Sequence, residues 1–246
     1  MHHPDSTRRL ALFALALLLP LAAAHAAVTG SGKAATQTRE ASGFAAISLR
    51  GGMDVVVRQG AREAVQVTAD DNLLPLLPTT VEGSGDQRTL VIQWQRGESI
   101  RTRTKTVVTV DVVKLTALAS SGSGDIVVEA LKTPALALSI SGSSDAKVSG
   151  LDAEQLRVAI TGSGDVQASG RAARFNLSIA GSGDVRAREL VADDVDISIA
   201  GSGDAGVQAN KTLSVGIAGS GDVEYSGAAT ITHSRIAGSG SMRQRP

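Results

Sequence analysis

The sequence predicts an all-β protein whose main part is a parallel β-helix, a solenoid with coils of about 18–20 residues. Two observations support this fold class. A short glycine- and serine-rich string ending in aspartate recurs along the second half of the chain, and apolar side chains alternate with polar or small ones on both sides of each copy. A β-rich N-terminal part is expected to be continuous with the solenoid.

The repeated string reads Ser-Gly-Ser-Gly-Asp in its first copy and keeps its length throughout. Its copies end at Asp125, Asp145, Asp165, Asp184, Asp204 and Asp222, and a degenerate last copy ends at Ser241. The intervals between these residues are 20, 20, 19, 20, 18 and 19. A fixed period of this length is typical of solenoids, in which a unit too small to bury its own apolar face stacks on its neighbours.

The flanking residues have a period of two. The position five residues before the aspartate is occupied by Ile140, Ile160, Ile179, Ile199 and Ile217, with Ile236 before Ser241. Alternation with β-branched residues indicates strands with one buried face, so each repeat is expected to hold two short strands. The Gly-Ser-Gly-Asp string forms a tight corner, where glycine permits unusual backbone angles. Ser144 occupies a glycine position, so this position either does not need a positive φ or is strained.

The chain divides into five predicted segments. Residues 1–26 read as an export signal, with Arg8 and Arg9 before a ten-residue apolar run and an Ala24-His25-Ala26 cleavage site. Residues 27–43 are expected to form a flexible lead, 44–113 a β-rich cap, 114–242 the repeat coils and 243–246 a tail. Within the cap, the patterns predict strands over 44–49, 54–58, 65–68 and 90–95, a short helical turn or bend over 72–78, a hairpin-like turn over 82–86 and a long strand over 101–112.

Composition excludes several classes of function. The chain has no cysteine, which excludes disulfides, thiol nucleophiles and Cys-ligated zinc. Its 24 basic and 24 acidic residues argue against a nucleic-acid partner, and the scarcity of aromatic residues argues against aromatic sugar or base platforms. After removal of the signal only His233 remains as a histidine, so a Ser-His-Asp triad would have to use it. We therefore expect no enzymatic activity.

At this point the chain resembles a known family, the head-GIN-domain proteins, described as putative autotransporter adhesins. The residues that carry the resemblance are Phe44–Leu49, Asp54–Gly60, Asp71–Leu74, Thr89–Ile92 and the Gly-Ser-Gly-Asp series, over roughly residues 40–242. The resemblance implies an exported bacterial β-helical module whose molecular function is not established.

The strongest candidate site is the column of aspartates Asp125, Asp145, Asp165, Asp184, Asp204 and Asp222. Like charges stacked about 4.8 Å apart repel by about 0.9 kcal/mol per pair in water, so something must offset this cost. Two interpretations are open: each carboxylate accepts hydrogen bonds from backbone N–H groups of its own corner, or the column binds a cation such as Ca²⁺ between coils. No other metal or cofactor is expected.

A second candidate is basic. Arg101, Arg103 and Lys105 would share one strand face, near Arg96, and could meet an anionic glycan or lipopolysaccharide. The alternative is a charged, exposed edge that discourages aggregation.

These observations favour an exported, non-catalytic binding or adhesion-like module, periplasmic or at the cell surface, whose unknown envelope or surface ligand is a glycan or a protein. The alternatives are a self-assembling scaffold that forms homo-oligomers, and a glycan-active β-helical enzyme. No nucleic-acid partner and no transmembrane segment in the mature chain are expected.

Overall fold

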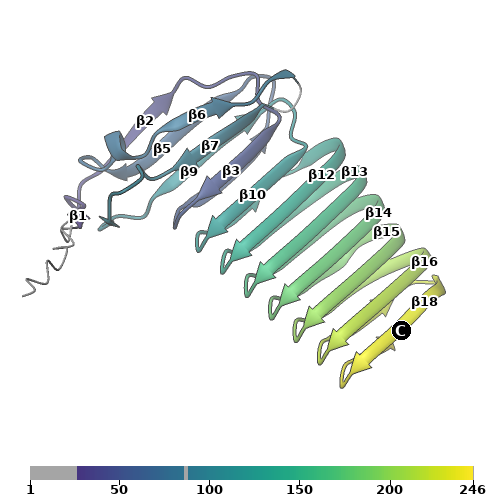
Figure 1. Ribbon diagram of the computed structural model, residues 1–246. Helices are drawn as coiled ribbons and strands as arrows, with labels where there is room; N and C mark the ends of the chain where they lie inside the picture. The colour runs from purple at the N-terminus through teal and green to yellow at the C-terminus, as the bar shows by residue number, and fades with distance from the viewer. Residues whose placement is uncertain (1–26, 86–87, 246) are drawn as a thin grey trace, which may run out of the picture.

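The computed structural model describes residues 27–85 and 88–245, so the predicted export signal lies outside the described residues. The described part is built from strands and one 3-10 turn (Figure 1). The N-terminal elements are β1 Val28–Thr29, β2 Ala34–Arg39, β3 Ala46–Arg50, β4 Asp54–Gln59, β5 Ala64–Asp70, η1 Leu74–Leu76, β6 Thr79–Glu82, β7 Thr89–Gln93, β8 Ile100–Arg101 and β9 Val107–Val112. The repeat strands are β10 Ala117–Gly122, β11 Ile126–Val128, β12 Leu131–Gly142, β13 Ala146–Gly162, β14 Val166–Gly181, β15 Val185–Gly201, β16 Ala205–Gly219, β17 Asp222–Ser226, β18 Thr230–Gly238 and β19 Ser241–Gln244.

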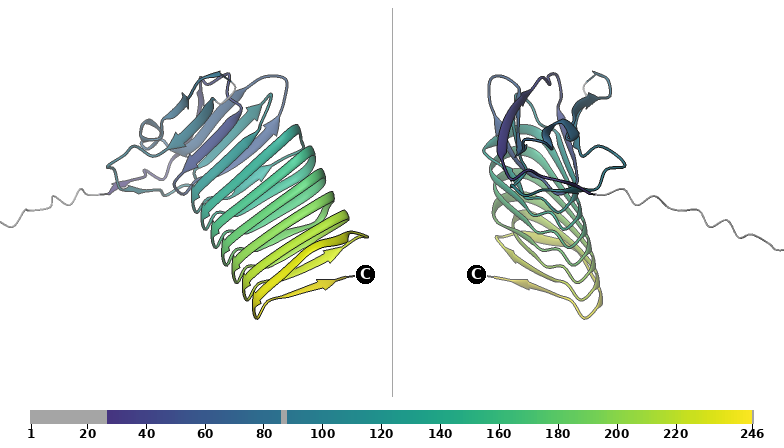
Figure 2. Two further views of the ribbon diagram at one scale, coloured as in Figure 1. Left: turned by 45° about the vertical axis from the view of Figure 1, so that its right-hand side comes forward. Right: turned by 90° about the vertical axis from the view of Figure 1, so that its left-hand side faces the viewer.

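The repeats form the predicted parallel solenoid. Successive coils stack along one axis, each strand pairing in parallel with its counterpart about 20 residues on (Figure 2). The expectation of two short strands per repeat is wrong for the middle of the array, where β13, β14 and β15 run for 16 or 17 residues from one tight corner to the next. Each long strand bends at the opposite corner, and the register shifts there absorb the differences in repeat length.

Two glycines shape each tight corner for different reasons. The first, Gly122 in the first repeat and Gly238 in the last, has a positive φ of +112° to +156° throughout the array. The second has no positive φ but no room for a side chain: a Cβ on Gly203 would lie 2.2 Å from the carbonyl oxygen of Gly183 in the preceding coil. Ser144 occupies this second position, and no described non-glycine residue has a positive φ. Glycine is therefore favoured at this position by lack of space rather than by backbone angle, and Ser144 is the exception.

The N-terminal part continues the solenoid. Strands β3 and β4 pair in parallel with β10 and β11, and β7 and β9 extend the same two faces outward. The predicted hairpin before β7 is present as the antiparallel pair β6–β7. Two expectations are wrong. The predicted flexible lead contains β1 and β2, and β2 pairs antiparallel with β5. The predicted long strand over 101–112 is interrupted, since only β8 and β9 are strands there.

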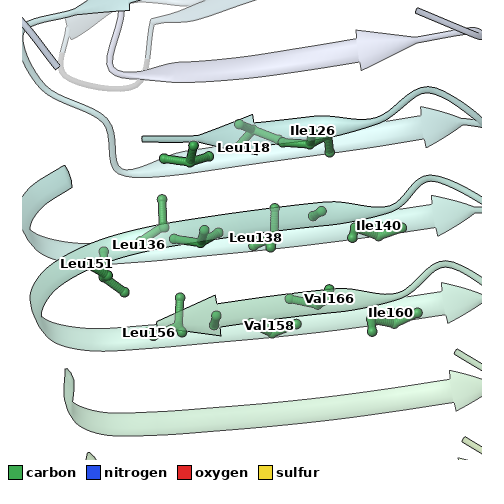
Figure 3. Close-up of a cluster of buried hydrophobic side chains, with 14 of the residues drawn as sticks. Leu118, Ile126, Leu136, Leu138, Ile140, Leu151, Leu156, Val158, Ile160 and Val166 are labelled. Atoms are coloured by element: carbon green, nitrogen blue, oxygen red, sulfur yellow. The ribbon is translucent and has the colours of Figure 1, made fainter. Parts of the chain in front are cut away.

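One hydrophobic core runs through the cap and the coils. The inward residues form columns, such as Ile140 above Ile160, each about 1% exposed (Figure 3). The single tryptophan, Trp94, packs against this core beside Gly51 in the cap. The single tyrosine, Tyr225, lies in β17 near the other end and is 7% exposed. No helix in the described residues is long enough and apolar enough to cross a membrane.

Candidate functional site

The aspartates of the tight corners form a column that links coil to coil. A carboxylate Oδ1 accepts a hydrogen bond from the backbone N–H of the residue that ends the next corner, at N···O distances of 2.7–3.0 Å. The accepting residues are Asp54, Asp145, Asp165, Asp184, Asp204 and Asp222. The sequence predicted donors in the same corner, and the structure places them in the following coil. Each of these carboxylates thus holds the next corner, which offsets the repulsion along the column. Asp125 lies in the column but accepts no such bond from Asp145.

Asp54 belongs to this column and was not predicted. The corner Gly51-Gly52-Met53-Asp54 joins β3 to β4, and Asp54 Oδ1 accepts from the backbone N–H of Asp125 at 2.9 Å. Its signal is present in the sequence, because Ile47, Leu49, Val55 and Val57 occupy the positions that are inward in every later coil. The string was missed because it lacks the Ser-Gly pair.

Basic side chains pair with the aspartate column at both ends and in the middle. Lys105 Nζ lies 2.5 Å from Asp54 Oδ2, and this hydrogen bond and charge raise the pKa of the Lys105 ammonium. Arg186 lies 3.5 Å from Asp165 and 3.8 Å from Asp184, between their second carboxylate oxygens. At the far end the hydroxyl and the backbone N–H of Ser241 donate to Asp222, and together with Arg243 they hold the pKa of the Asp222 carboxyl below its usual value.

Beside the column the outer surface is hollowed. One hollow of about 330 Å³ lies along the first coils and a second of about 300 Å³ along the last, and both reach Arg186. We call this surface the corner groove; it is lined by the aspartate column on one side and by Lys147, Gln167, Arg186, Arg188, Glu224 and Arg243 on the other. On the side of the groove opposite the aspartates, Gly206 has no side chain and leaves space. The Arg188 side chain lies over Gly206 and pairs with Glu224. The groove is therefore polar, open and of mixed charge.

The predicted basic face is not a strand face. The chain bends after Arg101, because the backbone N–H groups of Arg103 and Thr104 donate to Asp70 Oδ2 at 2.9 and 3.1 Å. Asp70 is fully buried and also accepts from Gly32 N–H at 2.7 Å. Burial alone would raise its pKa, but these backbone donors together lower the pKa of the Asp70 carboxyl below its usual value. Lys105 pairs with Asp54, and of the three residues only Arg101 belongs to a strand, so they do not form one strand face.

The described residues form no site that would support the enzymatic or the metal-binding alternative. His233 is exposed in β18, where its register neighbour is Ser214. In the described ranges no three His, Cys, Asp or Glu side chains converge in a way that would hold a metal ion. The column has one aspartate per coil. Except at Asp125, one carboxylate oxygen of each aspartate accepts a hydrogen bond from a backbone N–H group of the next coil.

Similarity to known proteins extends over the cap and most of the coils. A family model described as putative auto-transporter adhesin, head GIN domain, matches residues 43–229. The chain belongs to this family. No curated protein matches its sequence.

Several solved structures share the fold of this head GIN domain protein. It is 25% identical to a putative lipid binding protein from Parabacteroides distasonis ATCC 8503, with a TM-score of 0.74 over 90% of this chain and 100% of that one. It is 25% identical to a putative adhesin from Bacteroides fragilis NCTC 9343, with a TM-score of 0.80 over 89% and 100% of the two chains. A putative adhesin from Parabacteroides distasonis ATCC 8503 is 26% identical, with a TM-score of 0.71 over 89% and 100%.

Proposed function

We propose that this chain is an exported, non-catalytic binding module of the adhesin type, and that an elongated polar ligand of the envelope or cell surface lies along its corner groove. The observation that carries the proposal is the corner groove itself, whose two hollows share Arg186 and together reach from Asp125 to Arg243. It offers hydrogen-bond donors and acceptors at the coil spacing of about 4.8 Å. A glycan chain or an extended protein segment has the length and polarity to contact several coils at once.

The environment of Asp222, at the end of the column, favours binding over catalysis. A general acid needs a carboxyl group whose pKa is raised toward neutrality, usually one member of a pair in different environments. In the corner groove Asp222 has a lowered pKa, so it is more firmly ionised than a free carboxylate. The remaining polar side chains supply charge and hydrogen bonds for recognition, such as Lys147 and Gln167 on the open side of the groove.

The test compares charge changes on two faces. Lys147→Glu combined with Gln167→Glu changes the groove at two exposed side chains that form no hydrogen bond or ion pair among the described residues and lie outside the aspartate column. Arg157→Glu is the matched control, because Arg157 is exposed on β13, away from the groove. Immobilised protein would be exposed to polysaccharide and protein fractions of the envelope of the source bacterium. We expect retention by the wild type and the control and loss in the groove variant; equal retention by all three proteins would contradict the proposal.

A second candidate function, self-assembly, is favoured by the last coil. Strand β18 is exposed at all nine positions, and Ile231 and Ile236 are 42% and 39% exposed, whereas their counterparts Leu213 and Ile217 are at most 2% exposed. A second copy docking on this end would bury them. Light scattering after gel filtration tests this candidate: a concentration-dependent dimer that Ile236→Lys abolishes would support it, and a monomer at every concentration would rule it out.

Export is part of the first proposal and rests on the family and on the signal read in residues 1–26. Cell fractionation with an antibody to the folded chain measures it directly. We expect the protein in the periplasmic or surface fraction, with an N-terminus near Ala27.

A further inference from the structure

The first two repeats depart from the pattern together, at two positions that touch. In the first repeat Ser120 stands where later repeats have an inward isoleucine, and in the second Ser144 stands where the others have the second corner glycine. Both are buried, at 4% and 0% exposure, and their hydroxyl oxygens lie 2.9 Å apart. They are two of the few buried polar side chains in the described residues.

Elsewhere in the array the isoleucine and the next coil's glycine fit each other closely. A Cβ on Gly203 would lie 3.0 Å from Cγ2 of Ile179, and Gly164 and Gly183 have the same relation to Ile140 and Ile160, at 3.0 and 3.1 Å. A serine at such a glycine would therefore collide with the isoleucine below it. Ser144 is accommodated because Ser120 lacks the branched methyl group and supplies a hydroxyl partner instead.

The same contact alters the aspartate column. The backbone N–H of Asp145 makes no hydrogen bond to Asp125, although the corresponding bond is present on either side of this step. A Cβ at this corner position would come within 2.1–2.3 Å of the preceding carbonyl oxygen in the later coils, so the corner of Ser144 cannot close to the same distance. The step between the first two repeats is therefore chemically different from all later steps.

We infer that Ser120 and Ser144 form a register pair, which admits only the second repeat onto the first and so fixes the alignment of coils that are otherwise interchangeable. Near-identical repeats can misassemble during folding by stacking on a coil other than their own neighbour, and the loop-closure entropy of skipping one coil opposes this only weakly. Placing the first repeat against a glycine corner would leave the Ser120 hydroxyl buried without a partner, and placing the Ser144 corner on an isoleucine would cause a collision. A single buried polar pair fixes register in other repetitive folds in the same way.

The first experiment is a double-mutant cycle with Ser120→Ile, Ser144→Gly and the combination. Ser120→Ile places a methyl group against Ser144, and Ser144→Gly leaves a hydroxyl unpaired, so each single change should lower the folding equilibrium constant about tenfold. The combination restores the array's usual pair and should recover at least the wild-type value. Additive effects in urea unfolding would overturn the inference.

The second experiment measures the register of the first two repeats. It compares the wild type with the Ser120→Ile, Ser144→Gly protein, because the two facing residues fit each other in both. Ala119 and Ser139 are outward register neighbours on β10 and β12, and the chain has no cysteine, so Ala119→Cys with Ser139→Cys forms a disulfide only when the first two repeats are adjacent. After refolding under oxidising conditions, the wild-type background should be crosslinked as a monomer. The Ser120→Ile, Ser144→Gly background should lose part of this product to uncrosslinked or oligomeric species. Equal crosslinking in both backgrounds would show that the two serines fill space without determining register.

Discussion

The glycine at the second corner position offers the sharpest test of how the coils are held. In Gly203→Ala the new Cβ would sit 2.2 Å from the carbonyl oxygen of Gly183 and 3.0 Å from Cγ2 of Ile179. Since the first of these atoms is backbone, the corner must move by roughly 1 Å to relieve the contact. That displacement also stretches the hydrogen bond from Asp204 N–H to Asp184, now 3.0 Å long, beyond a useful length.

The close contact and the lost hydrogen bond together set the expected loss of stability. Overpacking of a filled site costs about 1–3 kcal/mol, and loss of one hydrogen bond adds about 1 kcal/mol, so Gly203→Ala should destabilise the protein by about 2–4 kcal/mol. Gly216→Ala is the matched control, in the strand that follows this corner, β16, because the nearest atom to its Cβ would be Ile197 O at 3.9 Å. There alanine fits and restricts the unfolded chain, which predicts no loss or a gain of about 0.4–1 kcal/mol.

Urea unfolding followed by far-ultraviolet circular dichroism measures both variants. We expect the midpoint to fall for Gly203→Ala and to hold or rise for Gly216→Ala, with an unchanged slope in each case. If both variants lost the same stability, the corner would not be as closely packed as the structure has it, and the spatial explanation for its glycines would be refuted.

Three further predictions concern the core, the column and the cap. Ile179→Ala should cost about 2–5 kcal/mol in urea unfolding, whereas Ser178→Ala on the outer face should stay within about 0.5 kcal/mol; equal losses would contradict the alternation. Asp184→Asn should cost little, because an amide oxygen accepts the same N–H group, and Ca²⁺ should leave the melting temperature unchanged; a Ca²⁺-dependent rise that this variant abolishes would restore the cation interpretation. Asp70→Asn should destabilise at neutral pH. Because the folded pKa of Asp70 is lowered, its contribution is present above about pH 4 and is lost as the pH falls through the folded value, so the two unfolding midpoints should converge in acid.

Features that repeat could be predicted from the sequence, and features that depend on distant partners could not. The solenoid, its inward columns and the stacked aspartates follow from the interval and the alternation, which are local. The bend after Arg101 depends on Asp70, more than thirty residues earlier, which draws in the backbone N–H groups of Arg103 and Thr104. Strand β2 is made of small and polar residues and exists because β5 offers it an edge, so nothing in its own composition marks it.

The candidate site was predicted in part for the same reason. The aspartates were found by their motif, but the donor to each one comes from the next coil, a relation that needs the stacking distance and direction. Asp54 was missed although its neighbours follow the repeat pattern, because its corner lacks the Ser-Gly pair and stands 71 residues before Asp125, far from the regular period. Arg186 and Lys147 occupy an outward position whose residue type differs from coil to coil. No sequence pattern therefore predicts that they line the groove.

The positions of Trp94 and Tyr225 have a consequence for spectroscopy. The chain has one residue of each type, and they lie at opposite ends of the continuous core, one in the cap and one in the penultimate coil. Indole fluorescence therefore reports the environment of the first end, and tyrosine absorbance that of the last. The unmodified protein therefore contains an optical probe at each end. Coincident melting curves from the two chromophores would indicate that the solenoid unfolds as one cooperative unit, and separate curves would indicate that it frays from its exposed end.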